Sequence, residues 1–65
     1  MSSMIITIEI AEKVRIKRGR LSMTKTKLSE KLGIARQTLV KIEKGQYKCP
    51  KRIYEKVMTW LVEEI

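Results

Sequence analysis

The chain has 65 residues, with 15 Lys and Arg against 7 Asp and Glu, and its formal net charge is +8 at pH 7. A chain of this length buries only about 60% of the surface that its unfolded form exposes, so we expect one domain over residues 1–65, of marginal stability that dimerisation would improve. The positive charge favours a polyanionic partner, above all nucleic acid. The sequence has no apolar run of about 18 residues and no signal-peptide pattern. We therefore expect a cytoplasmic protein without a membrane partner.

Residues 1–7 form an apolar leader. Along it, two sets of residues alternate, namely Met4, Ile6 and Ile8 against Ile5, Thr7 and Glu9. Such alternation predicts a short strand. A strand of about five residues needs a partner for its backbone groups, and a second copy of the chain across a dyad would supply one. In the other interpretation, the leader is a terminus whose isoleucines merely cover the helices.

The first helix is predicted from Ile8 to Arg20. From about Ile8, the spacing of Ile10, Val14, Arg18 and Leu21 changes to a helical period.

The segment from residue 24 to residue 45, TKTKLSEKLGIARQTLVKIEKG, is the most informative part of the chain. Thr24 is suited to cap a helix, Leu28 and Leu32 lie four residues apart on one face, and Gly33 supplies the left-handed residue that ends the helix. After a tight turn at Gly33 and Ile34, a second short helix is predicted. Two short amphipathic helices around such a turn are the layout of a helix-turn-helix DNA reader.

The second of these helices is predicted from Arg36 to Lys44, ending at Gly45. At about 100° per residue, two faces separate. The face that suits a core holds Ala35, Thr38, Leu39, Ile42 and Glu43, and the opposite face holds Arg36, Gln37, Val40, Lys41 and Lys44. On the second face, Arg or Lys can bond guanine O6 and N7, Gln can bond adenine N6 and N7, and Val40 can touch a thymine methyl. This face therefore predicts base readout.

The segment from residue 45 to residue 51, GQYKCPK, is predicted as a basic loop. Cys49 is the only cysteine of the chain, which has no histidine. An intramolecular disulfide is therefore impossible, and a Cys/His metal site lacks ligands. Lys48 and Lys51 would lower the pKa of the Cys49 thiol but complete no recognisable active site. We expect a plain loop thiol, no enzyme activity, no metal and no cofactor.

The last helix starts at Pro50 and is predicted to the chain end. Its apolar residues cover an arc of about 200°, whereas one core needs little more than about 100°. The edge formed by Ile53, Val57 and Trp60 closes the domain. A predicted dimer surface remains, formed by Tyr54, Met58, Val62 and Ile65. The alternative is a packed terminal helix with scattered exposed apolar residues.

The residues from about Ile10 to Leu61 resemble the phage repressor and Cro type of helix-turn-helix regulator, also called lambda-repressor-like or XRE-like. The resemblance implies that an Arg late in the first helix pairs with a Glu near the end of the recognition helix, and Arg18 and Glu43 stand at these positions. Ala35 departs from the family, in which Ser or Thr commonly caps the recognition helix. Loss of such a cap costs about 0.5–2 kcal/mol, so we expect the recognition helix to fray until DNA binds.

The resemblance also implies which residues contact DNA. Arg36, Gln37 and Lys41 stand where the family reads bases. The residues predicted to contact phosphates are Thr24, Lys25, Lys44, Gln46, Lys48 and Lys51.

Together these features predict an all-α, lambda-repressor-like bundle of about four helices with a possible N-terminal strand. We expect it to bind a pseudo-palindromic duplex DNA operator as a homodimer and to regulate transcription, as a Cro-like repressor of phage type. Two alternatives stay open. One is an antitoxin or antirepressor that uses the last helix to bind a protein. The other is an RNA-binding protein, although the chain has no Phe, 2 Tyr and 1 Trp and so lacks the aromatic surface that readers of single strands favour.

Overall fold

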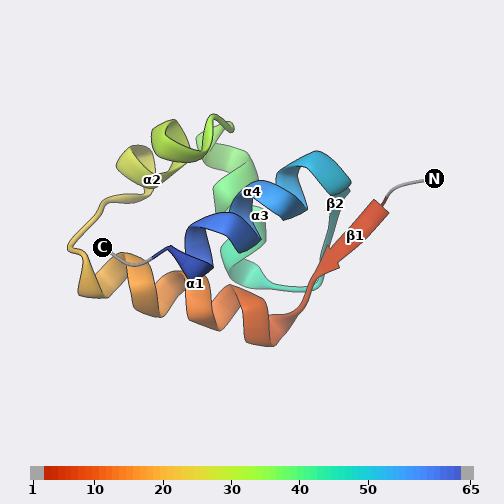
Figure 1. Ribbon diagram of the computed structural model, residues 1–65, viewed down its shortest axis with the longest axis horizontal. Coiled ribbons are helices and arrows are strands. Elements are labelled where there is room, and N and C mark those ends of the chain that lie inside the picture. Colours follow the sequence, from red (N-terminus) through yellow and green to blue (C-terminus); the bar gives the residue numbers. More distant parts are fainter. Residues whose placement is uncertain (1–2, 64–65) are drawn as a thin grey trace.

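A computed structural model describes residues 3–63 of the chain (Figure 1). Within them, four helices and two short strands follow in the order β1 (Ser3–Ile6), α1 (Ile8–Arg20), α2 (Lys25–Leu32), α3 (Arg36–Lys44), β2 (Tyr47–Pro50) and α4 (Lys51–Val62). The helix predictions are confirmed, except that α4 ends earlier than predicted: the backbone is already extended at Glu63. Ile65 lies outside the described residues.

α1 begins where a side chain satisfies one of its first backbone donors. Thr7 has an extended backbone, and its hydroxyl accepts a hydrogen bond of 3.1 Å from the backbone N–H of Ile10. The last turn of α1 holds Lys17, Arg18 and Arg20, and cations there interact favourably with the negative end of the helix dipole.

The two strands form an antiparallel pair within the chain (Figure 1). Ile6 lies opposite Tyr47, and Met4 lies opposite Cys49. These four side chains are buried or half-buried, whereas Ile5 and Lys48, which also oppose each other, are exposed. The predicted short N-terminal strand is present. Neither of the two alternatives for it holds, because the strand pairs with β2 of the same chain and not with a second copy, and it is more than a terminus that covers the helices. The segment predicted as a basic loop therefore contains a strand, and the all-α class must be corrected to a mainly helical fold with a small sheet.

The core is one apolar cluster between the helices and one face of the sheet. Every helix and strand contributes at least one of its buried members, which are Ile6, Ala11, Val14, Leu28, Leu32, Leu39, Ile42, Cys49, Val57 and Trp60. Trp60 is the largest of the fully buried side chains. The core therefore joins segments that are far apart in the sequence.

The C-terminal end of α4 packs on Lys17 of α1, which is itself only 6% exposed. The Lys17 ammonium group donates hydrogen bonds to the carbonyl oxygens of Trp60 and Glu63, the latter at 2.8 Å, and lies 4.7 Å from the centroid of the Trp60 ring. Since the last turn of α4 has no basic residue of its own, Lys17 supplies the cation that terminal carbonyls favour. Both Lys17 and the indole ring are thereby held in place.

No helix among residues 3–63 combines the length and the apolar content that are needed to span a membrane.

Candidate nucleic-acid interface

α2 and α3 are joined by a tight turn, and local hydrogen bonds stabilise both ends of α2. At the start of α2, the Thr24 hydroxyl accepts a hydrogen bond of 3.0 Å from the backbone N–H of Lys27. At its end, Gly33 has φ 69° and ψ 36°, a left-handed conformation that costs glycine little. The backbone N–H of Ile34 then bonds to the carbonyl of Ser29. Both the predicted cap and the predicted left-handed glycine are confirmed, and the turn fixes the direction in which α3 leaves α2.

α3 has a buried face and an exposed face. Leu39 and Ile42 are fully buried, and Glu43 is only 5% exposed. The residues on the exposed side are Arg36, Gln37, Lys41 and Lys44, with Val40 partly buried beside them. The two faces agree with the prediction, except that Ala35, which was placed on the core side, is exposed. It lies at the N-cap, where the chain turns away from the core, and it makes no side-chain capping bond.

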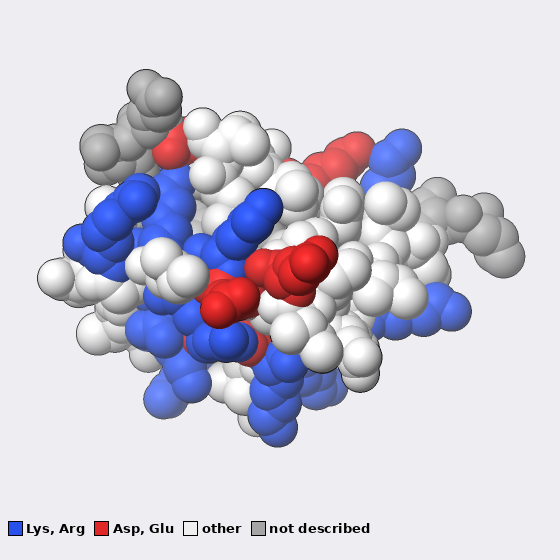
Figure 2. Space-filling view, turned by 90° about the horizontal axis from the view of Figure 1, so that it is seen from below, with Lys and Arg blue, Asp and Glu red and all other residues white. Residues whose placement is uncertain are grey.

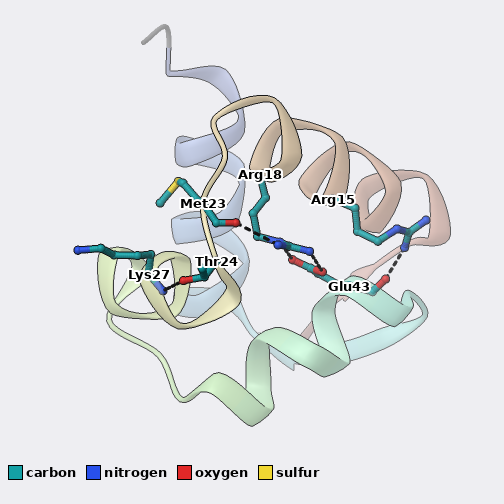
Figure 3. A network of polar contacts seen from close by, with 6 residues as sticks. All are labelled: Arg15, Arg18, Met23, Thr24, Lys27 and Glu43. Carbon is teal, nitrogen blue, oxygen red and sulfur yellow. Dashed lines mark hydrogen bonds and ion pairs between the residues drawn. The ribbon is translucent and has the colours of Figure 1, made fainter.

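Arg18 holds the back of α3 against α1 (Figure 3). Its Nε and Nη2 atoms donate to the two carboxylate oxygens of Glu43, at 2.7 Å and 3.1 Å, and its Nη1 atom donates to the carbonyl of Met23 at 3.1 Å. The guanidinium therefore ties α1 to the recognition helix and also to the segment that leads into α2. A bidentate pair of this kind fixes geometry as well as contributing energy, so the orientation of the α3 face depends on Arg18.

Arg15 adds a second link between the same two helices (Figure 3). Its guanidinium donates to the backbone carbonyl of Glu43 near the end of α3, where helix carbonyls lack intrahelical partners. The sequence pattern predicted no role for Arg15 or Lys17. Nothing in the sequence marks them, because their acceptors are backbone carbonyls 28 to 46 residues away.

The residues predicted to contact phosphates are spread over the elements that flank α3. Thr24 and Lys25 stand at the start of α2, Lys44 ends α3, and Gln46, Lys48 and Lys51 follow between α3 and the first turn of α4. All six are exposed except Lys25, which is half-buried. Lys51 also lies 3.9 Å from the Glu55 carboxylate, but an exposed ion pair is worth little and leaves Lys51 able to move to another anion.

Charge is distributed unevenly over the surface. Figure 2, which views the molecule from the side of α1, shows Lys and Arg side chains gathered toward the left and lower parts of this face, with acidic side chains near its centre. A basic surface attracts a polyanion over several ångströms and releases counterions when the polyanion binds. The basic parts of this face would therefore attract a polyanion.

Comparison with known protein families identifies the family. The model of the helix-turn-helix family HTH_3 matches residues 14–52, more than half of the chain. The chain belongs to the helix-turn-helix family of the phage repressor and Cro type. Members of this family are DNA-binding transcription regulators and are generally not enzymes. No curated protein and no solved structure matches the chain.

The matched range contains each of the features that hold the helix-turn-helix in shape: Arg18, Thr24, Gly33 and Glu43 all lie within it.

The structure also tests what the sequence predicted for Cys49. Cys49 lies in β2 rather than in a loop and is only 2% exposed. Burial raises the pKa of the Cys49 thiol, and a hydrogen bond from the Tyr54 backbone opposes this effect only in part. The predicted lowering by neighbouring lysines is therefore wrong. Residues 3–63 contain no group of His, Cys, Asp and Glu that would hold a metal ion.

The predicted dimer surface on α4 is narrower than the helical wheel suggested. Tyr54 is half-buried and packs against the core, and Met58 is also half-buried. Val62 is 74% exposed. Part of the predicted surplus apolar arc is thus used inside this chain.

Proposed function

We propose that this helix-turn-helix protein is a Cro-like repressor that occupies a pseudo-palindromic duplex DNA operator as a homodimer. The observation that carries the proposal is the exposed strip on α3. Arg36, Gln37 and Lys41 are exposed, while Glu43 on the opposite face of the same helix is fixed by Arg18. Donors of these types on one face of a helix are what the edges of guanine and adenine require in the major groove.

We expect one group of residues to determine the specificity for a DNA sequence and another group to determine the affinity for any duplex. We expect Arg36, Gln37 and Lys41 to read bases, with Val40 against a thymine methyl group. The exposed Lys44, Gln46, Lys48 and Lys51, together with Thr24 and Lys25, serve the phosphates. Base contacts distinguish sequences, whereas phosphate contacts strengthen binding to all duplexes and make it depend on salt.

The dimer follows from the size of the reader. One recognition helix contacts only a few base pairs, and the many competing sites in a genome make so short a site insufficient for specificity. Two copies with recognition helices about 34 Å apart would read two half-sites on one side of the duplex. Repression then requires no catalysis, since the bound dimer blocks access to the DNA it covers.

Selection of bound duplexes from a random pool, followed by sequencing, tests the proposal. A palindromic motif is the expected result, and binding to it should survive an excess of structured RNA. Gln37→Ala should then cost about 1–3 kcal/mol on the selected duplex and relax preference at one position per half-site. Lys48→Ala should weaken binding to all duplexes alike and reduce the salt slope by about 1.

Lys31→Ala is the matched control, because Lys31 is an exposed lysine at the end of α2 that faces a hollow between α2 and α4. It should change neither specificity nor the preferred motif. Equal losses on selected and random duplexes for Arg36, Gln37 and Lys41 variants would show that α3 makes only electrostatic contacts. Preferential binding to the RNA competitor would reject the operator altogether.

A further inference from the structure

β1 and the start of α1 lie at one end of the molecule (Figure 1), and both carry exposed apolar side chains. Ile5 is 53% exposed and Ile8 is 56% exposed. Together with Thr7, Glu9 and Gln46, they line a hollow of about 530 Å³. We call Ile5, Thr7, Ile8 and Glu9 the isoleucine patch; Gln46 is left out of it, because it is proposed above to contact phosphate. Neither isoleucine belongs to the core cluster, whereas Ile6, which lies between them in the sequence, is fully buried in it.

The hollow of the isoleucine patch has no Lys or Arg in its lining, in a chain in which 15 of 65 residues are Lys or Arg. Lys48, the exposed strand partner of Ile5, lies beside the patch. Two copies that each carry a net charge of +8 repel each other wherever their basic surfaces meet. A surface for self-association must therefore avoid these residues. The hollow beside Ala35 and Thr38, at the start of α3, does not meet this condition, because Arg52 and Lys56 line it.

The isoleucine patch also stands at the C-terminal end of the recognition helix. Gly45 directly follows α3, and a Cβ atom built on Gly45 would lie 3.0 Å from Cα of Ile8. The chain passes from there through Gln46 into β2, which pairs with β1. Two copies whose recognition helices lie in successive major grooves can touch through a surface at one end of α3. Of the hollows at the two ends of α3, only the one at the C-terminal end has no basic side chain in its lining.

We propose that a second copy of this chain docks on the isoleucine patch, patch against patch, when two copies occupy neighbouring half-sites. This inference rests on the proposed function, since the DNA brings the two copies together. The contact is small compared with the roughly 800 Å² per partner of a standard interface. It therefore holds the two copies together only weakly in dilute solution, and it is measured as cooperativity between half-sites on DNA.

The experiment uses the full chain and two duplexes that carry the motif selected above. One has both half-sites with centres about 10 base pairs apart, and the other has one half-site scrambled. Titration of both gives the affinity for one half-site and the cooperativity between two. The test variant is Ile5→Thr with Ile8→Thr, which keeps β-branched residues at both positions. Ile16→Thr is the matched control, because Ile16 is 59% exposed on α1 but outside the patch.

The wild type should bind two half-sites cooperatively. Each patch isoleucine has about half of its surface left to bury, which corresponds to roughly a fourfold to tenfold change in a binding constant. The test variant should therefore lower the cooperativity by about tenfold or more while binding the single half-site as the wild type does, which also shows that it is folded. Ile16→Thr should leave both values unchanged.

Three results would overturn the inference. The first is a wild type that fills two half-sites independently, and the second is a test variant that keeps full cooperativity. The third is loss of cooperativity in Val62→Thr but not in the test variant, which would assign the contact to α4. Each of these leaves DNA binding intact. If the wild type does not bind even the single half-site, the proposed function itself fails, and the docking inference fails with it.

Discussion

Replacement of Arg18 tests the connection between α1 and the recognition helix. The Arg18 side chain is 21% exposed and that of Glu43 is 5% exposed. In Arg18→Met, the Glu43 carboxylate would stay in this buried position without either of its two charged hydrogen bonds, and the Met23 carbonyl would lose a donor. Breaking a buried pair typically costs about 3–5 kcal/mol, and because Arg18 keeps some contact with water we expect a cost near the lower end of that range. A domain of 65 residues has a total stability of only about 3–10 kcal/mol, so this one substitution removes a large part of it.

A double-mutant cycle measured by urea unfolding checks this reasoning. Glu43→Leu alone should cost less, because the freed guanidinium can reach water. Arg18→Met combined with Glu43→Leu should recover at least about 1 kcal/mol of the summed losses, since residues in contact couple by about 0.5–3 kcal/mol. Arg20→Met, at an exposed arginine on the same helix, should change stability by less than about 0.5 kcal/mol. Strictly additive losses in the cycle would refute the claim that the pair acts as a unit.

Three further predictions concern the scaffold, each with its own measurement. In thermal unfolding, Gly45→Ala should destabilise the protein by more than about 1 kcal/mol, because φ is 89° there and the added methyl group would press on Ile8. Gly19→Ala should instead stabilise α1 by about 0.5–1 kcal/mol, because a Cβ atom on Gly19 would have no heavy atom within 4 Å. Ala35→Ser should add the missing cap of α3 and stabilise the protein by about 0.5–2 kcal/mol; an unchanged melting temperature would contradict this. Because burial raises the pKa of Cys49, the folded state favours the neutral thiol. The contribution of this thiol to the free energy of unfolding should be fully present at neutral pH and be lost as the pH rises through and above the ordinary thiol range. Cys49→Ala should not show this loss. Iodoacetamide labelling of the folded wild type at about pH 8, near the ordinary thiol pKa, should be slow and should accelerate in urea, and fast labelling without denaturant would show that the thiol is not buried.

The helices were predictable because their signals are local. A helix depends on apolar residues three and four positions apart and on the few residues that cap its ends. Thr24 caps α2 and Gly33 ends it in the left-handed conformation, as their residue types and positions predict. The two faces of α3 follow from the same periodicity, so the sequence was sufficient to predict that Arg36 and Gln37 are exposed.

The Arg18–Glu43 pair has a different origin. Periodicity alone does not bring together two charged residues 25 positions apart. The pairing was predicted from the resemblance to the phage repressor and Cro type, and the structure contains it. Sequence reasoning reached this contact only because the surrounding motif was specific enough to align distant positions.

The tertiary structure alone decided the contacts that join the two ends of the chain. The sequence predicted a strand near Ile6 but not its partner, because β1 and β2 are only four residues each and lie about 40 positions apart. For the same reason it missed Lys17, whose acceptors are backbone carbonyls at the end of α4, and the burial of Cys49 in a segment that looked like a loop. Backbone groups are the same in every residue, so no residue type marks which carbonyl or which strand edge a distant side chain or segment will meet. That choice depends on how the helices pack, and it is made only when the core closes.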